Sequence, residues 1–219
     1  MKLRLKEKGC YYKDYIYRDL EEKMFNLSEL EKLKKRAIEE HIPIIMDETL
    51  DVIKQILEKE KPHKILEIGT AVGYSASQFV RFSPNSVVDT IELDETRAKE
   101  AIQNIRNIGI SDKINILVGN AVEILPTLKE EYELIFIDAN KGKYPFFLQE
   151  GIRLAKDGGI LLADNILYKG YVMSDYNKHK QRTAVRNLRE YIQKAQENEY
   201  LETEILEVGD GLAISRVKK

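Results

Sequence analysis

Three oxygen-bearing side chains stand directly after two apolar runs in the second half of the chain. Asp138 follows residues 135–137. Asp164 and Asn165 follow residues 161–163. If these runs are neighbouring parallel strands, their carboxyl ends meet at one edge of the sheet, and the side chains can converge. Such an all-oxygen set suits Mg²⁺, Mn²⁺ or Ca²⁺, whereas zinc is disfavoured because no Cys or His belongs to it. Each Asp alone could be a cap or turn residue, but the combination favours a metal site.

A glycine-bearing turn follows an earlier β-type run, residues 64–68. Gly69 lets the backbone turn and approach a ligand closely, and a helix that begins near Gly73 offers unpaired N–H groups. The dinucleotide fingerprint requires glycine where this chain has Ala71, so a pyrophosphate cradle is disfavoured and a nucleoside cofactor without phosphates is favoured. Glu92, at the end of the second run, is placed to accept hydrogen bonds from both ribose hydroxyls.

Two further segments reach the same edge of the expected sheet. Gly119-Asn120-Ala121 closes the third run and could frame an adenine. Lys141, three residues after Asp138, could remove a proton from a substrate hydroxyl or hold the resulting oxyanion, although a surface lysine is the alternative. A cation bound at this edge would lower the pKa of that hydroxyl. Enzymes with a histidine-bound metal or a nucleophilic serine find little support, since the histidines share no metal-ligand spacing and no G-x-S-x-G elbow occurs.

The elements that position these groups alternate between strand and helix. Crossover helices such as residues 95–108, capped by Asp94, predict a doubly wound α/β fold with a parallel sheet covered on both faces. A long helix near residues 178–198 precedes two runs joined by Gly209-Asp210-Gly211, which predicts a terminal hairpin. The expected strands are residues 64–68, 87–93, 114–118, 134–137, 159–163, 201–208 and 212–217.

The first 60 residues have a helical pattern and are expected to form a cap on the sheet. With 219 residues, 43% of them hydrophobic, the chain is expected to form a single domain over residues 1–219. The lone Cys10 receives no role, and the N-terminus lacks a secretory signal, so a cytoplasmic location is expected. No apolar stretch approaches the roughly 20 residues that cross a bilayer, so no membrane association is expected. A tyrosine-rich segment is expected to pack internally or form a dimer face: Tyr11, Tyr12, Tyr15 and Tyr17.

The chain resembles the metal-dependent O-methyltransferases related to catechol and caffeoyl-CoA O-methyltransferases, from about Ile42 to the C-terminus. This resemblance implies a Rossmann-like sheet of seven strands with an antiparallel terminal hairpin, S-adenosylmethionine as the methyl donor, and Mg²⁺ or a similar cation. Relatives are often dimeric, so a homodimer is expected. The motifs that carry the resemblance are residues 66–75, Ile91-Glu92, Gly119-Asn120-Ala121, residues 137–141 and Ala163-Asp164-Asn165.

The resemblance also implies roles for single residues. Lys141 matches the lysine assigned as the catalytic base. Asp138, Asp164 and Asn165 match the metal ligands, with Asp138 also near the cofactor and part of the catalytic group. The implied cofactor contacts are Glu67, Gly69 and Ser75 for the methionine part, Glu92 for the ribose, Asn120 and Ala121 for the adenine side, and Ile45 over the cofactor.

Within this family the chain is most similar to the bacterial tRNA 5-hydroxyuridine methyltransferases, which form 5-methoxyuridine at the wobble position. The segments that carry this similarity are residues 42–44, 164–170 and 208–213. A basic region after the metal ligands, with interleaved tyrosines, could bind tRNA phosphates and bases, or could be a solvated helix face. Its cations are Lys169, Lys178, Lys180, Arg182, Arg186 and Arg189. The alternatives are a small catechol-like or phenolic acceptor and a non-catalytic nucleoside-binding module.

Overall fold

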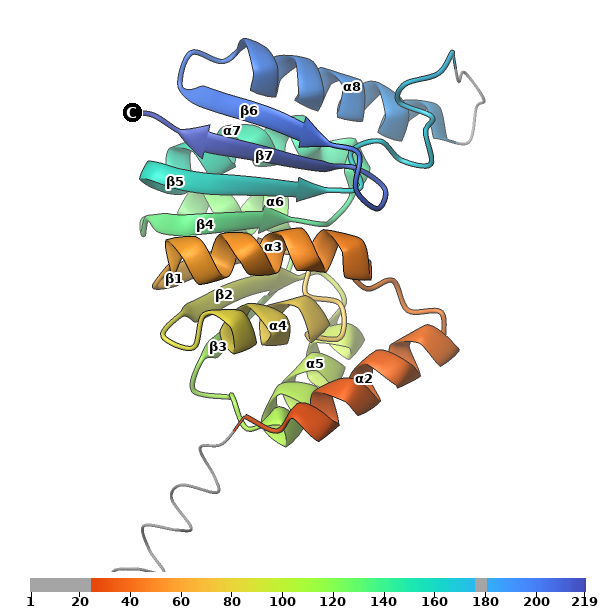
Figure 1. Ribbon diagram of the computed structural model, residues 1–219, viewed down its shortest axis with the longest axis vertical. Coiled ribbons are helices and arrows are strands. Elements are labelled where there is room, and N and C mark those ends of the chain that lie inside the picture. The colour runs from red at the N-terminus through yellow and green to blue at the C-terminus, as the bar shows by residue number, and fades with distance from the viewer. Residues whose placement is uncertain (1–24, 176–180) are drawn as a thin grey trace, which may run out of the picture.

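A seven-stranded sheet with the order β3-β2-β1-β4-β5-β7-β6 forms the centre of the molecule (Figure 1). The computed structural model describes residues 25–175 and 181–219. β1 to β5 pair in parallel, and β7 lies antiparallel between β5 and β6. The strands are β1 (Lys64–Ile68), β2 (Val87–Glu92), β3 (Ile114–Val118), β4 (Tyr132–Ile137), β5 (Ala155–Asp164), β6 (Leu201–Leu206) and β7 (Leu212–Val217). The doubly wound α/β architecture with its antiparallel terminal hairpin is confirmed.

The strand order switches sides at β1, which pairs with β2 on one side and β4 on the other. In an open parallel sheet, ligands bind outside the carboxyl ends of the strands at such a switch point. The loops after β1 and β4 carry the glycine turn and Asp138. The topology therefore places both predicted halves of the site at one edge.

Helices cover both faces of the sheet. In Figure 1, α3 and α4 lie in front of the sheet, and α6 and α7 lie behind it. Phe79 of α4 packs edge to face on Phe136 of β4, with ring centroids 5.2 Å apart. The helices are α2 (Leu27–Glu39), α3 (Asp47–Glu60), α4 (Tyr74–Phe82), α5 (Glu95–Ile108), α6 (Ala121–Ile124), α7 (Tyr144–Leu154) and α8 (Arg182–Glu197), with short 3₁₀ turns η1 (Leu125–Thr127) and η2 (Lys141–Lys143).

The sequence places the ends of α5 correctly. The Asp94 carboxylate accepts hydrogen bonds from the N–H groups of Thr96 (2.7 Å) and Arg97 (3.1 Å), which fixes the first turn beside the expected cofactor site. Gly109 ends the helix in the left-handed conformation with φ 83°.

Five expected strand boundaries are wrong, including the end of β5, which lies at Asp164. β4 and β5 begin earlier than expected. For β5 the reason is that Gly158-Gly159 lies inside the strand, beside a register shift, rather than in a turn. β2 ends at Glu92, and β6 ends at Leu206.

The N-terminal cap is interrupted. The described part of it consists of α2 and α3, with residues 40–46 between them. Ile42 and Ile45 from this connection are buried and line the site cavity. Cys10, residues 11–17 and the start of the helix expected from residue 178 lie outside the described residues. No helix in the described part of the chain is long and apolar enough to cross a membrane.

Candidate active site

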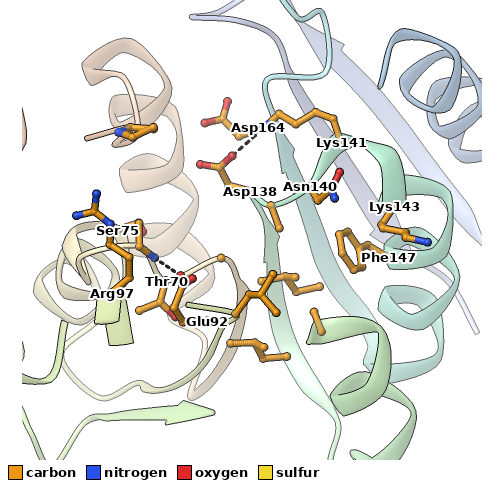
Figure 2. Close-up of a pocket in the computed structure, with 18 of the residues that line it drawn as sticks. Thr70, Ser75, Glu92, Arg97, Asp138, Asn140, Lys141, Lys143, Phe147 and Asp164 are labelled. Carbon is orange, nitrogen blue, oxygen red and sulfur yellow. Dashed lines mark hydrogen bonds and ion pairs between the residues drawn. The ribbon is translucent and has the colours of Figure 1, made fainter. Parts of the chain in front are cut away.

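A cavity of about 670 Å³ opens at the carboxyl edge of the parallel strands. Loops after β1, β2, β3, β4 and β5 line it, and residues 42–45 cover it. Figure 2 shows Asp138, Lys141 and Asp164 at one end and Glu92 at the other. Of the residues assigned to catalysis, metal binding and cofactor binding, the cavity is lined by Ile45, Gly69, Ser75, Glu92, Asn120, Ala121, Asp138, Lys141, Asp164 and Asn165. The structure therefore brings together every one of them except Glu67.

Gly69 occupies a position that admits no side chain. Its φ is +108°, and a Cβ atom built on it would lie 2.1 Å from the carbonyl oxygen of Asp138. The loop after β1 is tied to its neighbours by hydrogen bonds from Gly69 N to Ile91 O (3.0 Å) and from Asp138 N to Ile68 O (3.0 Å). Glycine is thus required by the close approach of two chain segments, in addition to any contact with a ligand.

Glu67 lies behind the cavity wall. Its side chain is fully buried, and its two oxygens accept hydrogen bonds from the hydroxyls of Ser75 (2.5 Å) and Thr90 (2.5 Å). Ser75 itself lines the cavity. The structure therefore places Ser75 between Glu67 and the cavity, and a direct contact of Glu67 with the cofactor stays a prediction.

Burial raises the pKa of Glu67 from 4.5 to about 7, although the hydroxyls of Ser75 and Thr90 oppose the shift. Between these values the folded protein holds a proton that the unfolded chain releases. The free energy of unfolding should therefore fall by up to about 3 kcal/mol as pH rises from 4.5 to 7. A Glu67→Gln variant lacks this loss, so its stability relative to the natural protein should increase over that range. Urea unfolding of both proteins between pH 5 and pH 8 checks this, and a difference independent of pH would contradict it.

Glu92 is oriented by two backbone N–H groups. Its Oε2 accepts from Ala71 (2.8 Å), and its Oε1 accepts from Asp94 (2.9 Å). Each oxygen retains a lone pair that a ribose hydroxyl could use. The neighbouring Leu93 also lines the cavity, although its side chain is 71% exposed. Sequence reasoning missed Leu93; the available signal was an apolar residue directly after Glu92, the acid expected to bind a ribose.

Asn120 and Ala121 line the cavity next to the end of β3. The side chain of Asn120 caps α6, because its Oδ1 accepts a hydrogen bond from Val122 N (3.0 Å). The adenine contact expected of Asn120 must therefore coexist with this structural role.

Lys141 lies among the three predicted metal ligands. Its Nζ donates to Asp138 Oδ1 (2.9 Å) and to Asn165 Oδ1 (2.8 Å). In this arrangement the ammonium group is a cation bound by the oxygens expected to bind a metal. The convergence of these residues at the strand ends was predicted, and the hydrogen bonds of Lys141 to two of the ligands are an addition from the structure.

Asp164 provides the test of whether a divalent cation fits. Its Oδ1 accepts a hydrogen bond from Asn165 N (2.7 Å), but its Oδ2 is buried without a hydrogen-bond partner among the described residues. Burial and the nearby Asp138 raise the pKa of Asp164 to about 7. A buried oxygen without a donor destabilises the protein, and a bound cation would compensate for it. No group of three or more His, Cys, Asp or Glu in the described ranges could hold a metal, so the candidate set is two carboxylates and one amide.

Those predicted tRNA-binding residues that the structure describes lie outside the cavity lining. Lys169, Arg182 and Arg186 are exposed. Arg189 has a structural role, because its guanidinium donates to the backbone oxygens of residues 171, 172 and 174. Lys178 and Lys180 lie outside the described residues.

Two cavity residues with positive charge were missed. Arg97, in the first turn of α5, and Lys143, at the end of η2, both line the cavity. Arg97 is paired with Glu100 at 3.1 Å, whereas Lys143 is exposed and forms no ion pair with any residue that the structure describes. Lys143 stands two positions after the predicted base, and this proximity was the available signal.

The loop after Asn165 is held by the β6–β7 turn. Asn165, Tyr168 and Lys169 have φ values of 55°, 44° and 58°, which are uncommon for residues other than glycine. Asp210 accepts two hydrogen bonds from this loop. Its carboxylate accepts from Lys169 N (2.5 Å), and its backbone oxygen accepts from Leu167 N (3.0 Å). The predicted hairpin turn thus also fixes the segment that carries a candidate metal ligand.

The chain is similar to known O-methyltransferases. A family model described as O-methyltransferase matches residues 18–218. The catechol O-methyltransferase of Niastella koreensis is 35% identical over 164 residues, which span 70% of this chain and 73% of that protein. The catechol O-methyltransferase of Mycobacterium tuberculosis is 34% identical over 114 residues, which span 51% of this chain and 52% of that protein. The match to the second relative therefore covers only about half of its length.

Solved structures share the fold. A Staphylococcus aureus protein, provisionally named a caffeoyl-CoA O-methyltransferase, is 34% identical with a TM-score of 0.81, over 86% of this chain and 91% of that one. A Bacillus cereus O-methyltransferase, solved with S-adenosylhomocysteine, is 24% identical with a TM-score of 0.78, over 87% of this chain and 91% of that one.

The strand order and the likeness to the Staphylococcus aureus structure define the class, a Rossmann-like methyltransferase fold. Within this class, the match over residues 18–218 is specific. The chain belongs to the O-methyltransferase family.

Proposed function

We propose that this chain transfers the methyl group of S-adenosylmethionine to a ring hydroxyl, with a divalent cation held by Asp138, Asp164 and Asn165. One observation carries the proposal: the buried Asp164 Oδ2 lacks a partner among the described residues at the end of the cavity where Lys141 lies, away from Glu92 (Figure 2). The glycine turn and Glu92 would hold the cofactor, and the oxygen ligands would act at its methyl end.

Methyl transfer breaks the bond between the sulfonium sulfur and the methyl carbon and forms a bond from that carbon to the acceptor oxygen. The hydroxyl loses its proton, and the sulfonium becomes a neutral thioether. A divalent cation, when bound, lowers the pKa of a hydroxyl beside it. Lys141 Nζ lies within 3 Å of two candidate ligands. As an ammonium it can hold the oxyanion there, and as a neutral amine it can take the proton.

A small catechol-like or other phenolic acceptor is the acceptor class that the relatives support best. Both curated relatives described above are named catechol O-methyltransferases. A catechol carries two neighbouring oxygens on a planar ring, and hard divalent cations prefer oxygen ligands. A cavity of about 670 Å³ has a size typical of small-molecule sites.

A second candidate acceptor is 5-hydroxyuridine at the wobble position of tRNA. Its hydroxyl also lies next to a second oxygen on a planar ring, so the same chemistry applies. The observation that favours it is a set of exposed cations that form no ion pair with any described residue: Lys143, Lys169, Arg182 and Arg186. Such cations can neutralise phosphates. Tyr168 and Tyr171 pack on each other with ring centroids 6.0 Å apart, so stacking on bases would require them to separate.

Methyl transfer from labelled S-adenosylmethionine, with Mg²⁺, into catechol and into tRNA that contains 5-hydroxyuridine separates the two acceptors. A variant with Lys169, Arg182 and Arg186 changed to Gln adds a second criterion. If tRNA is the acceptor, this variant should raise the KM for tRNA about tenfold or more, with a weaker dependence on salt. If a phenol is the acceptor, the variant should leave its kinetics unchanged.

The matched control replaces three exposed lysines on other surfaces, Lys35, Lys59 and Lys99, with Gln. It removes the same amount of charge, so it separates a local effect from a change in net charge. Label in neither acceptor under any of these conditions would contradict the proposed function.

A further inference from the structure

Tyr144 begins α7, directly after the 3₁₀ turn that carries Lys141. Its side chain is fully buried. The hydroxyl lies 2.8 Å from the backbone oxygen of Asp164 and 3.3 Å from the backbone oxygen of Ile137. A phenol has one proton to donate, so the shorter contact, to Asp164, is the main hydrogen bond. Tyr144 therefore contacts the ends of both strands that lead to the candidate metal ligands.

These strand ends are the point where the ladder between β4 and β5 stops. The last register pair is Ile137 with Ala163, and the next residue on each strand is Asp138 or Asp164. The pairing of β4 with β5 ends there, although Asp164 still pairs with Leu212 of β7 and Asp138 N donates to Ile68 O. The Tyr144 hydroxyl adds a contact between the ends of β4 and β5 where their pairing stops.

The phenol remains a neutral donor in this environment. Burial, together with the carboxylates of Asp138 and Asp164, raises the pKa of Tyr144 well above its usual value. The ring also contacts the candidate base, because Lys141 Nζ lies 5.5 Å from its centroid, within the range of a cation–π interaction. Tyr144 thus contacts the strand ends that lead to two candidate metal ligands, and it also contacts Lys141.

We propose that Tyr144 is a positioning residue that sets the spacing of Asp138 and Asp164 for a divalent cation. This inference rests on the proposed function, because it assumes that these carboxylates hold a metal. Residues that support metal ligands through hydrogen bonds typically change metal affinity by about 10- to 100-fold when mutated. The competing interpretation is that Tyr144 only fills the core.

Tyr191 of α8 supplies a matched control. It is also fully buried, and its ring packs against that of Tyr144 with centroids 5.6 Å apart. Its hydroxyl lies near Ser215 and makes no hydrogen bond of normal geometry with the described residues. Tyr144→Phe and Tyr191→Phe therefore remove the same atom from adjacent buried rings, but only the first removes a contact with the strand ends.

The test is Mn²⁺ binding to the full chain, measured by electron paramagnetic resonance without an acceptor. Tyr144→Phe should weaken Mn²⁺ binding about tenfold or more, whereas Tyr191→Phe should leave it unchanged. S-adenosylhomocysteine affinity should stay within about twofold in both variants, because the phenylalanine ring keeps the packing.

Four results would overturn the inference. If Tyr144→Phe binds Mn²⁺ as tightly as the natural protein, or if Tyr191→Phe weakens binding equally, Tyr144 is a packing residue and the proposed function stands. If Tyr144→Phe loses S-adenosylhomocysteine binding together with Mn²⁺ binding, its role is to hold the fold. If the natural protein binds no Mn²⁺, the metal assignment in the proposed function fails as well.

Discussion

Replacing Asp164 with alanine is expected to reduce metal-dependent methyl transfer at least about a thousandfold while leaving cofactor binding largely intact. The buried carboxylate has one oxygen without a partner among the described residues, and a cation that stabilises developing charge contributes several kcal/mol. The loop expected to bind the cofactor follows β1, and Glu92 ends β2, whereas Asp164 ends β5. Steady-state transfer of labelled methyl, with calorimetric measurement of S-adenosylhomocysteine affinity, checks both parts.

The control for this variant is Asp157→Ala in the same strand. Asp157 is exposed at the opposite edge of the sheet, where it accepts a hydrogen bond from Lys219 N (2.9 Å). Methyl transfer by the Asp157 variant should match that of the natural protein. Unchanged turnover in Asp164→Ala would contradict the metal assignment.

Lys141→Met is expected to lower kcat by about 10²- to 10⁴-fold, the range typical of a lost general acid or base. Asp164→Ala removes a candidate metal ligand and should weaken metal binding, whereas Lys141→Met should not. The Lys141 ammonium contacts Asp138 and Asn165, so its removal takes away a competing cation and should leave Mn²⁺ affinity equal or higher. Pre-steady-state methyl transfer and Mn²⁺ titration of the same variant measure the two quantities.

Lys194→Met provides the reference for Lys141, because it removes a surface lysine that pairs with Glu190 on α8. Its kcat should not change. If Lys141→Met retained full kcat, the lysine would be a partner of the ligands and not a participant in proton transfer. If it lost both kcat and Mn²⁺ binding, its role would be structural.

Most of the fold could be predicted because apolar runs and crossover helices leave few arrangements for a parallel sheet. β1, β3 and β7 have the expected bounds. The start of β5 was misplaced because Gly158-Gly159 is typical of a turn, and only its pairing with β4 shows that the strand continues through it.

The candidate site was predictable where a topological rule applied. Parallel strands end at one edge, so Asp138, Asp164 and Asn165 could be brought together from the sequence. The burial of Glu67 behind Ser75 could not be, because the sequence pattern does not say which side of a loop faces a cavity. Tyr144 was missed for a similar reason: its partner atoms are backbone oxygens that become neighbours only when β4 and β5 pair.

Arg189 shows the limit of reasoning from charge alone. A basic residue in a basic segment indicated contact with phosphates, but its guanidinium instead binds backbone oxygens in the loop after Asn165. Composition predicts how many cations a segment has, and only the folded loop determines which of them are free.

The proposed function requires both S-adenosylmethionine and a divalent cation at Asp138, Asp164 and Asn165. The most direct test is single-turnover transfer of labelled methyl from S-adenosylmethionine to catechol, and in parallel to tRNA containing 5-hydroxyuridine, in Mg²⁺, after chelation, and after Mg²⁺ is restored. We expect product with Mg²⁺, at least about a thousandfold less after chelation, and full recovery on restoring Mg²⁺. Product formed at the same rate in the presence of chelator would contradict it.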